Sequence, residues 1–251
     1  AEQNDQVERL EQSGRQKESL NWQDERNLDR ILQKQQQQLE QLQEQTKSLK
    51  NILERFEENQ LGDNQNLEQL KERIDEQQQS LQEQSERWQE LQDLQQQLQD
   101  EDLLEEMAQS QQQQRAQEQN LERLVEMTRR FFVTQKMNQI SEQLDDLGKR
   151  QEALSQQQSD NQNNGDKEQQ QQQGQQQELN EEFDSIKQAL DNLEQENNKL
   201  KTPMSLPRDP GGEMDISDQQ KKATEALQQG EPSQAQKPQK QAGQKMQEMA
   251  Q

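Results

Sequence analysis

Apolar residues recur at alternating spacings of three and four residues through much of the chain. Between Leu28 and Leu98 they fill most of the first and fourth positions, called a and d, of a seven-residue heptad. A 3.5-residue repeat held over this many turns is typical of helices wound on partner helices. The pattern therefore predicts an all-α fold, with long helices in a coiled-coil or helical-hairpin bundle. The apolar a and d residues are Leu28, Leu32, Leu39, Leu42, Leu49, Leu53, Phe56, Leu67, Leu70, Ile74, Leu81, Trp88, Leu91 and Leu98.

A turn signal interrupts this heptad region near its middle. Residues 61–66 (LGDNQN) combine a glycine that suits a helix C-terminus with Asn66, which suits the start of a new helix. Two alternatives follow. Either one helix runs straight through, because Gln60 and Leu67 keep the heptad frame, or the chain folds back as a hairpin.

The lengths of the two arms favour the hairpin. Residues 19–61 and 66–108 are nearly equal in length, as antiparallel partners are expected to be. We therefore predict a heptad coiled coil over residues 16–110 that turns at 61–66. The polar residues 1–15 are expected to form a frayed N-terminus.

Two further helices are expected beyond this region. Residues 115–158 predict an amphipathic helix whose apolar positions change heptad phase part of the way along. The glutamine-rich stretch 159–177 predicts a polar linker. Residues 178–202 restore a regular heptad, in which Asn197 falls at position a, where a buried amide can fix helix register.

Proline and glycine are expected to end the last heptad helix. They cluster between Pro203 and Gly212, and residues 203–251 are predicted to be linkers with weak short helices and a disordered C-terminal tail. One weak helix is expected from Ser217 to Gln229, residues 231–238 are expected to be linker, and the Ala/Met/Gln tail from Gln241 to Gln251 is compatible with a further short helix.

Composition favours extended helices over a compact globule. The chain has 251 residues, of which 24% are hydrophobic and 32% charged, with a net charge of −22. Such values usually indicate disorder, but a helical seam needs only about two apolar residues in seven. The polar core positions Gln35, Gln60, Gln77 and Gln84 weaken the seam, so marginal or partner-dependent stability is expected.

The residue types present argue against catalysis, metal binding and cofactor binding. The chain has no histidine and no cysteine, which removes the commonest general base, zinc ligand and thiol nucleophile. Residues 160–165 resemble the front of an EF-hand loop, but Gln162 and Gln171 stand where such a loop needs its ligands. We therefore expect no enzyme activity, catalytic residue, cofactor or metal.

The sequence also argues against two kinds of partner. The excess of carboxylates repels phosphate, so a nucleic-acid partner is not expected. The longest apolar run is Phe131–Val133, so this segment is not expected to enter a membrane, and any anchor is expected outside it. The chain begins at Ala1 rather than Met, which indicates a fragment or a processed form.

Aromatic and cationic residues concentrate at one place. The candidates for a protein interface there are Arg129, Arg130, Phe131, Phe132, Val133 and Lys136. Aromatic residues beside arginine are enriched at the centres of protein interfaces. The alternative is that the aromatics fill the helical bundle where the heptad phase slips, with the cations exposed beside them.

The second half of the chain resembles a known family. The residues that carry the resemblance are Arg129–Ile140, Leu144–Leu147, Lys149–Glu152, Glu178–Phe183, Leu200–Met204 and Lys245–Ala250. Together they are similar to the Gln-rich helical region of large Bacteroidota envelope proteins that lack an established activity. The resemblance spans roughly residues 120–251 and implies a periplasmic, cell-envelope setting with a membrane anchor elsewhere in the protein. It brings no catalytic residues.

Together these observations favour a structural or interaction module. We expect a coiled-coil spacer and protein-docking segment of a bacterial envelope protein, with other protein helices as partners, from the same chain or another. The competing hypothesis is a regulatory module whose marginal helices order only when a partner binds near Phe131–Val133.

Overall fold

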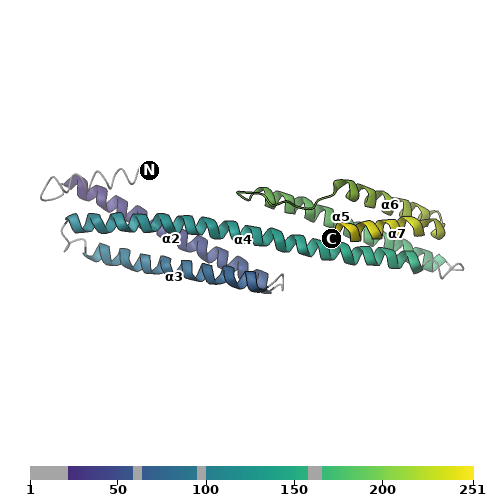
Figure 1. Ribbon diagram of the computed structural model, residues 1–251, viewed down its shortest axis with the longest axis horizontal. Coiled ribbons are helices and arrows are strands. Elements are labelled where there is room, and N and C mark those ends of the chain that lie inside the picture. The colour runs from purple at the N-terminus through teal and green to yellow at the C-terminus, as the bar shows by residue number, and fades with distance from the viewer. Residues whose placement is uncertain (1–21, 59–63, 95–99, 158–165) are drawn as a thin grey trace. The chain divides into compact units, whose positions relative to one another are not determined.

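The computed structural model describes residues 22–58, 64–94, 100–157 and 166–251. These residues form α-helices without a strand, so the predicted all-α fold is confirmed (Figure 1). The predicted frayed N-terminus and the centre of the predicted turn at 61–66 lie outside the described residues. The helices are α2 (Trp22–Glu58), α3 (Asn64–Leu94), α4 (Asp100–Gln157), α5 (Asp166–Asn198), α6 (Pro210–Gln228) and α7 (Pro232–Met249).

The chain divides into two compact units. Unit 1 covers Ala1–Thr128 and unit 2 covers Arg129–Gln251. Helix α4 contributes its first half to unit 1 and its second half to unit 2. Among the helices that the structure describes, none has a stretch both long enough and apolar enough to span a lipid bilayer.

In unit 1, α2 and α3 run antiparallel. The Gln43 amide donates to the Leu81 carbonyl at 3.3 Å, and the Lys50 ammonium lies 2.6 Å from the Asp75 carboxylate. Residue numbers thus rise along one helix as they fall along the other, which is the folded-back alternative of the sequence analysis. On α4, Ser110 accepts a hydrogen bond from Gln84 and Gln117 accepts one from Gln77, so α4 lies antiparallel to α3.

The heptad positions of unit 1 face its core. Leu53, Ile74 and Leu81 are fully buried, as expected when three helices close around an apolar seam. The polar seam residues Gln35 and Gln77 are buried with them. Burial of a leucine contributes roughly 1.5–3 kcal/mol, so this seam, rather than surface charge, holds the helices together.

Helix α4 begins earlier than predicted. It starts at Asp100, whereas the sequence analysis ended the heptad region at 110 and placed the next helix at 115. The intervening residues are mostly Gln, Glu and Ala, which are good helix formers, so a polar stretch continues as helix once one face packs. That face includes buried Ser110 and Gln114.

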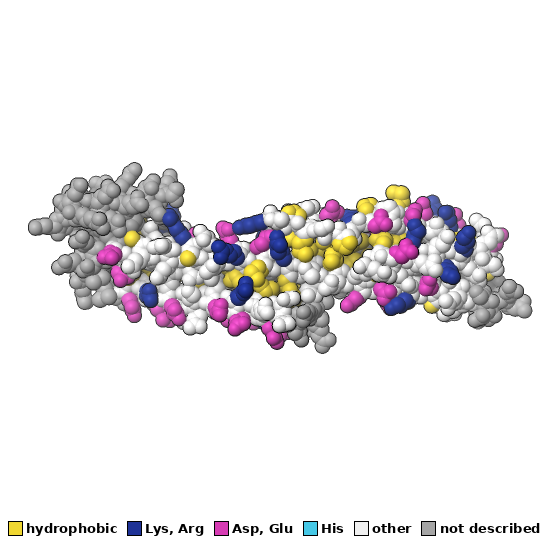
Figure 2. All heavy atoms as spheres, viewed as in Figure 1, with side chains coloured by type: hydrophobic (Ala, Val, Ile, Leu, Met, Phe, Trp, Pro, Cys, Tyr) yellow, Lys and Arg dark blue, Asp and Glu magenta, His cyan; other side chains and the backbone are white. Residues whose placement is uncertain are grey.

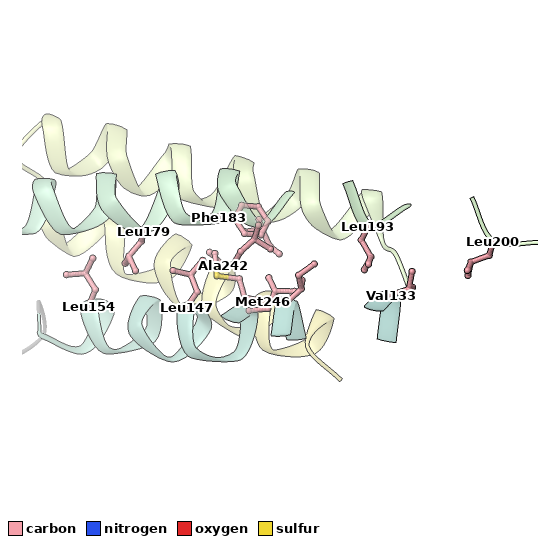
Figure 3. Close-up of a cluster of buried hydrophobic side chains, with 13 residues drawn as sticks. Val133, Leu147, Leu154, Leu179, Phe183, Leu193, Leu200, Ala242 and Met246 are labelled. Atoms are coloured by element: carbon pink, nitrogen blue, oxygen red, sulfur yellow. The ribbon is translucent and has the colours of Figure 1, made fainter. Parts of the chain in front are cut away.

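Unit 2 is a four-helix bundle in which successive helices alternate in direction. Lys187 near the middle of α5 bonds to Ser217 of α6, and Gln173 earlier in α5 bonds to Leu227 later in α6. The last helix returns along α4, since Ser141 donates to the carbonyl of Ala250 at 2.6 Å. The four helices enclose one apolar cluster, part of which is shown in Figure 3. Its buried members are Val133, Ile140, Leu144, Leu147, Leu154, Leu179, Phe183, Ile186, Leu193, Leu200, Ile216, Ala242 and Met246.

The structure corrects two predictions in unit 2. The polar linker predicted for 159–177 is shorter, because α5 already begins at Asp166. The linkers and weak helices predicted for 203–251 include two well-packed helices, of which α6 begins at Pro210 and α7 at Pro232.

Both corrections have a physical cause. Glutamine is a good helix former, so the glutamine-rich residues that follow Asp166 belong to α5 rather than to a linker. Proline at the first turn of a helix loses no hydrogen bond, because that N–H has no intrahelical partner. Pro210 and Pro232 therefore begin helices rather than end them. Pro238 lies inside α7, which continues past it with Gln239, Ala242 and Met246 buried in the bundle.

Candidate protein-interaction surface

The aromatic residues of the predicted interface serve the core of unit 2 in part. Val133 is 1% exposed and belongs to the apolar cluster, and Phe131 is also buried. Phe132 is half-buried and packs against the cluster. Packing therefore accounts for most of the apolar surface in this segment, and Phe132 keeps one side toward the surface.

The cations of the same segment lie at the surface. Arg129 and Arg130 are exposed, and one guanidinium nitrogen of Arg130 donates to the Thr202 carbonyl at 3.0 Å. The Lys136 ammonium donates to Gln139 Oε1 at 2.9 Å. The acceptors in these two hydrogen bonds are uncharged oxygens.

A shallow groove of about 670 Å³ runs between α4 and α5 and begins beside Lys136. Its floor is apolar, because Ile140 and Ile186 lie beneath it and Ala189 is half-buried at its side. The charged residues that line the groove are one cation, Lys136, and three carboxylates, Glu142, Asp146 and Glu182.

The chain that follows α5 is fixed to that helix by one amide. The Asn197 side chain accepts a hydrogen bond from the Met204 N–H and donates one to the Met204 carbonyl, both at 2.8 Å. Asn197 is buried, as its heptad position suggests, but the described structure shows it bonded to main chain rather than to a partner helix. It therefore anchors the segment that leads into α6.

Arg208 ties the same segment to α5 and α6. Its guanidinium lies 2.5 Å from the carboxylates of Asp191 and Glu194 and 3.0 Å from that of Glu213. Hydrogen bonds to Glu213 and Asp191 raise the pKa of Arg208 above its ordinary value, so the cation stays charged at every relevant pH. Three carboxylates satisfy this one cation.

A layer of four glutamines crosses the middle of unit 2, one from each helix. Gln151, Gln176, Gln220 and Gln239 are all almost fully buried. Gln151 and Gln176 exchange hydrogen bonds of 2.9 and 3.1 Å, and Gln239 donates to the same Gln176 oxygen at 2.9 Å. Gln220 donates to Gln151 at 3.4 Å. Because buried amides must find partners, this glutamine layer favours one alignment of the four helices.

Two glycines let α4 and α7 approach closely. A Cβ atom placed on Gly243 would lie 2.6 Å from the carbonyl oxygen of Gly148, and one placed on Gly148 would lie 2.7 Å from that of Gly243. Real Cβ atoms do not approach so closely. The crossing therefore depends on both glycines.

Sequence reasoning missed the glutamine layer although a signal for it existed. Gln151 shares the heptad phase of Leu147 and Leu154, and Gln176 precedes Leu179 by three residues. In a chain so rich in glutamine, residue type alone does not separate these amides from solvated ones. Figure 2 shows how much of the visible surface is uncharged polar side chain and backbone, drawn white.

The described residues contain no group of three or more acidic side chains placed to hold a metal ion. Comparison of the chain with protein-family models, with curated proteins and with solved structures finds no match.

Proposed function

We propose that this chain is a structural and interaction module, a coiled-coil spacer and protein-docking segment of a bacterial envelope protein. The periplasmic setting rests on the family resemblance alone. Its partners are other protein helices rather than nucleic acid or the membrane interior, and it acts by binding rather than by catalysis, without a cofactor.

The observation that carries this proposal is a division of roles along α4. Val133, Ile140 and Leu147 point into the bundle and are buried. Arg129 and Arg130 remain exposed about two helical turns before Lys136, which lines the groove. The bundle is thus closed by its own helices while cations and an apolar-floored groove remain accessible to a partner.

A second function is favoured by unit 1. Gln35, Gln77 and Gln84 occupy core positions there and weaken the apolar seam. A seam of this kind suits a regulatory module that becomes fully ordered only when a partner binds. Circular dichroism with light scattering separates the alternatives. A strongly helical chain with cooperative melting supports the spacer, and weak helicity that a partner restores supports regulation.

The docking role is tested with the full chain as bait in native envelope extract, after chemical cross-linking. We expect a helical protein to be retained by the wild type and lost with R129E/R130E. The matched control is K221E/K222E, which reverses two charges on the exposed face of α6. Equal retention by all three baits would contradict docking at this segment.

A further inference from the structure

Each of the three helices that the structure describes in unit 1 places one glutamine in the core at a similar level. These unit 1 glutamines are Gln35 of α2, Gln84 of α3 and Gln111 of α4, and all three are buried. The Gln84 amide donates to the Ser110 carbonyl at 3.3 Å, so Gln84 lies beside the neighbouring residue Gln111.

A second hydrogen bond brings α2 to the same level. Gln114 of α4 donates to the side-chain oxygen of Gln38 on α2 at 3.3 Å. Helices α2 and α4 are both antiparallel to α3, so they run parallel to each other. Gln111 and Gln35 each lie three residues before this pair, and they therefore share one level of the bundle.

The hydrogen-bonding capacity of the unit 1 glutamines is only partly used. Gln35 and Gln84 each bury an Oε1 atom, and Gln111 buries an Nε2 atom, without a partner among the described residues. Trp88, one helical turn beyond Gln84, buries its Nε1 atom in the same way. This part of the core thus contains two acceptors and two donors that lack a partner.

The glutamine layer of unit 2 shows what completes such an arrangement. That layer has one glutamine from each of four helices, and the four amides bond to one another. In unit 1 three described helices contribute one glutamine each. Because an amide both donates and accepts hydrogen bonds, a fourth glutamine supplies both kinds of partner that the other three lack.

A groove of about 620 Å³ runs between α2 and α3 and passes Ser85, next to the level of the unit 1 glutamines. Its charged lining residues are the exposed carboxylates Glu40, Glu44 and Glu86 and one cation, Lys47. Glu86 also accepts a hydrogen bond from an uncharged side chain of its own helix. A helix that docks along this groove is therefore favoured if it carries cations.

We propose that unit 1 docks an amphipathic helix of a partner protein as a fourth helix of its bundle. That helix carries one glutamine among its apolar core residues, and lysine or arginine over Glu40, Glu44 and Glu86. The inference rests on the proposed docking function and names the partner's chemistry. Helices α2 and α3 move apart along the groove to admit the partner, whose glutamine bonds to the unit 1 glutamines.

The test uses the full chain and a labelled, blocked 24-residue helical peptide. The peptide has Leu at its a and d positions, except for one central Gln, and Lys at the flanking positions. One comparison peptide has Leu in place of that Gln, and another has Glu in place of Lys. We expect fluorescence anisotropy to show about tenfold weaker binding of each comparison peptide.

Variants and one spectroscopic signal locate the binding site. Q35L/Q84L/Q111L is expected to reverse the preference, so that the all-Leu peptide binds more tightly than the Gln peptide. The matched control Q37A/Q79A/Q112A changes three exposed glutamines of the same helices and should keep the wild-type preference. The indole N–H signal of Trp88 in NMR spectra should shift when the Gln peptide binds. Circular dichroism checks that each variant stays helical.

Several results would overturn the inference. One is equal binding of the Gln and Leu peptides by the wild type, and another is a preference that Q35L/Q84L/Q111L retains. Self-association of the full chain that is lost in this variant would make a second copy the occupant. Binding that appears only after residues 1–21 are removed would make those residues the occupant. Either result would overturn the assignment to a partner protein.

The docking function and this inference can fail separately. If unit 1 shows no preference among the peptides while capture from envelope extract still depends on Arg129 and Arg130, the docking function stands and only the fourth-helix inference fails. If neither experiment shows the expected dependence, both proposals fail.

Discussion

Units 1 and 2 share a glutamine-rich composition but treat their buried polar groups differently. In unit 1, Gln35 and Gln84 each bury an Oε1 atom, and Trp88 an Nε1 atom, without a hydrogen-bond partner among the described residues. In unit 2 the glutamine layer joins four helices, and among its described atoms only the Gln239 oxygen lacks a partner. Amides that bond to one another favour one alignment, whereas amides that bury an oxygen without a partner mainly weaken a seam.

Charge and close packing separate the units further. Unit 1 carries 30 acidic against 14 basic residues, and unit 2 carries 21 against 15. Helices α2 and α3 contain no glycine, whereas α4 and α7 cross at Gly148 and Gly243. Unit 2 therefore has tighter and more specific packing, and unit 1 depends more on its leucines.

The largest expected effect comes from filling the glycine crossing. Gly243→Ala forces α4 and α7 apart and should destabilise unit 2 by about 2–3 kcal/mol. The control is Gly174→Ala on α5, where an added Cβ meets nothing within 4 Å. Because alanine favours the helix more than glycine does, this variant should stabilise unit 2 by about 0.5–1 kcal/mol. Urea unfolding by circular dichroism measures both. If Gly243→Ala left the free energy of unfolding unchanged, the proposed difference in packing between the two units would be contradicted.

Replacing one glutamine in each unit should give opposite signs. Gln151→Leu leaves the amides of Gln176 and Gln220 short of partners and should cost about 2 kcal/mol. Gln35→Leu extends the apolar seam of unit 1 and should stabilise it by about 1 kcal/mol.

The tryptophans allow the two effects to be separated. Both lie in unit 1, so Trp88 fluorescence follows unit 1 while circular dichroism follows the whole chain. Equal and same-signed changes for Gln151→Leu and Gln35→Leu would contradict the contrast between the two sets of amides.

A smaller effect is expected at the segment between α5 and α6. Asn197→Ala removes both hydrogen bonds to Met204 and should destabilise unit 2 by about 1 kcal/mol, with faster amide exchange at Met204. Asn198→Ala, at the exposed neighbouring position, is the matched control. Similar changes in both variants would show that the anchoring bonds contribute nothing.

The smallest effect concerns a surface pair that each unit possesses. Lys245 bonds Asp215 across α6 and α7 and lowers the pKa of Asp215 from its ordinary 3.8. The contribution of Asp215 is therefore complete above pH 3.8 and is lost as pH falls through the lowered value. Asp75 likewise raises the pKa of Lys50 across α2 and α3.

A carboxyl titration by NMR measures this contribution. We expect the Asp215 midpoint below 3.8 in the wild type and higher than that wild-type value in Lys245→Met. A wild-type midpoint that does not respond to Lys245→Met would show that the pair has no electrostatic effect. Since both units have such a pair, surface charge is not expected to explain their difference.

Much of the fold follows from local pattern, and the parts that do not are tertiary. The heptads located the buried leucines because a 3.5-residue repeat encodes one helix face. They missed the start of α6 at Pro210, because the same proline ends one element or begins another depending on what packs beyond it. They also missed Gly243, whose role depends on the position of Gly148.

The candidate surface was predicted only in part. The sequence located Arg129 and Lys136, but it did not show that residues 197–208 lie beside them. It also did not distinguish Val133, which is buried, from Phe132, which keeps one side exposed. Both distinctions depend on which helices surround α4, and no local pattern contains that information.

Cross-linking within one chain tests most directly whether each seam is covered by helices of the same molecule. Because the chain has no cysteine, pairs can be introduced without background, K50C/D75C for unit 1 and D215C/K245C for unit 2. With a short bismaleimide, both pairs should give a cross-linked monomer, whereas K50C/Q89C should not. Cross-links that appear only between chains, or in neither pair, would contradict the account.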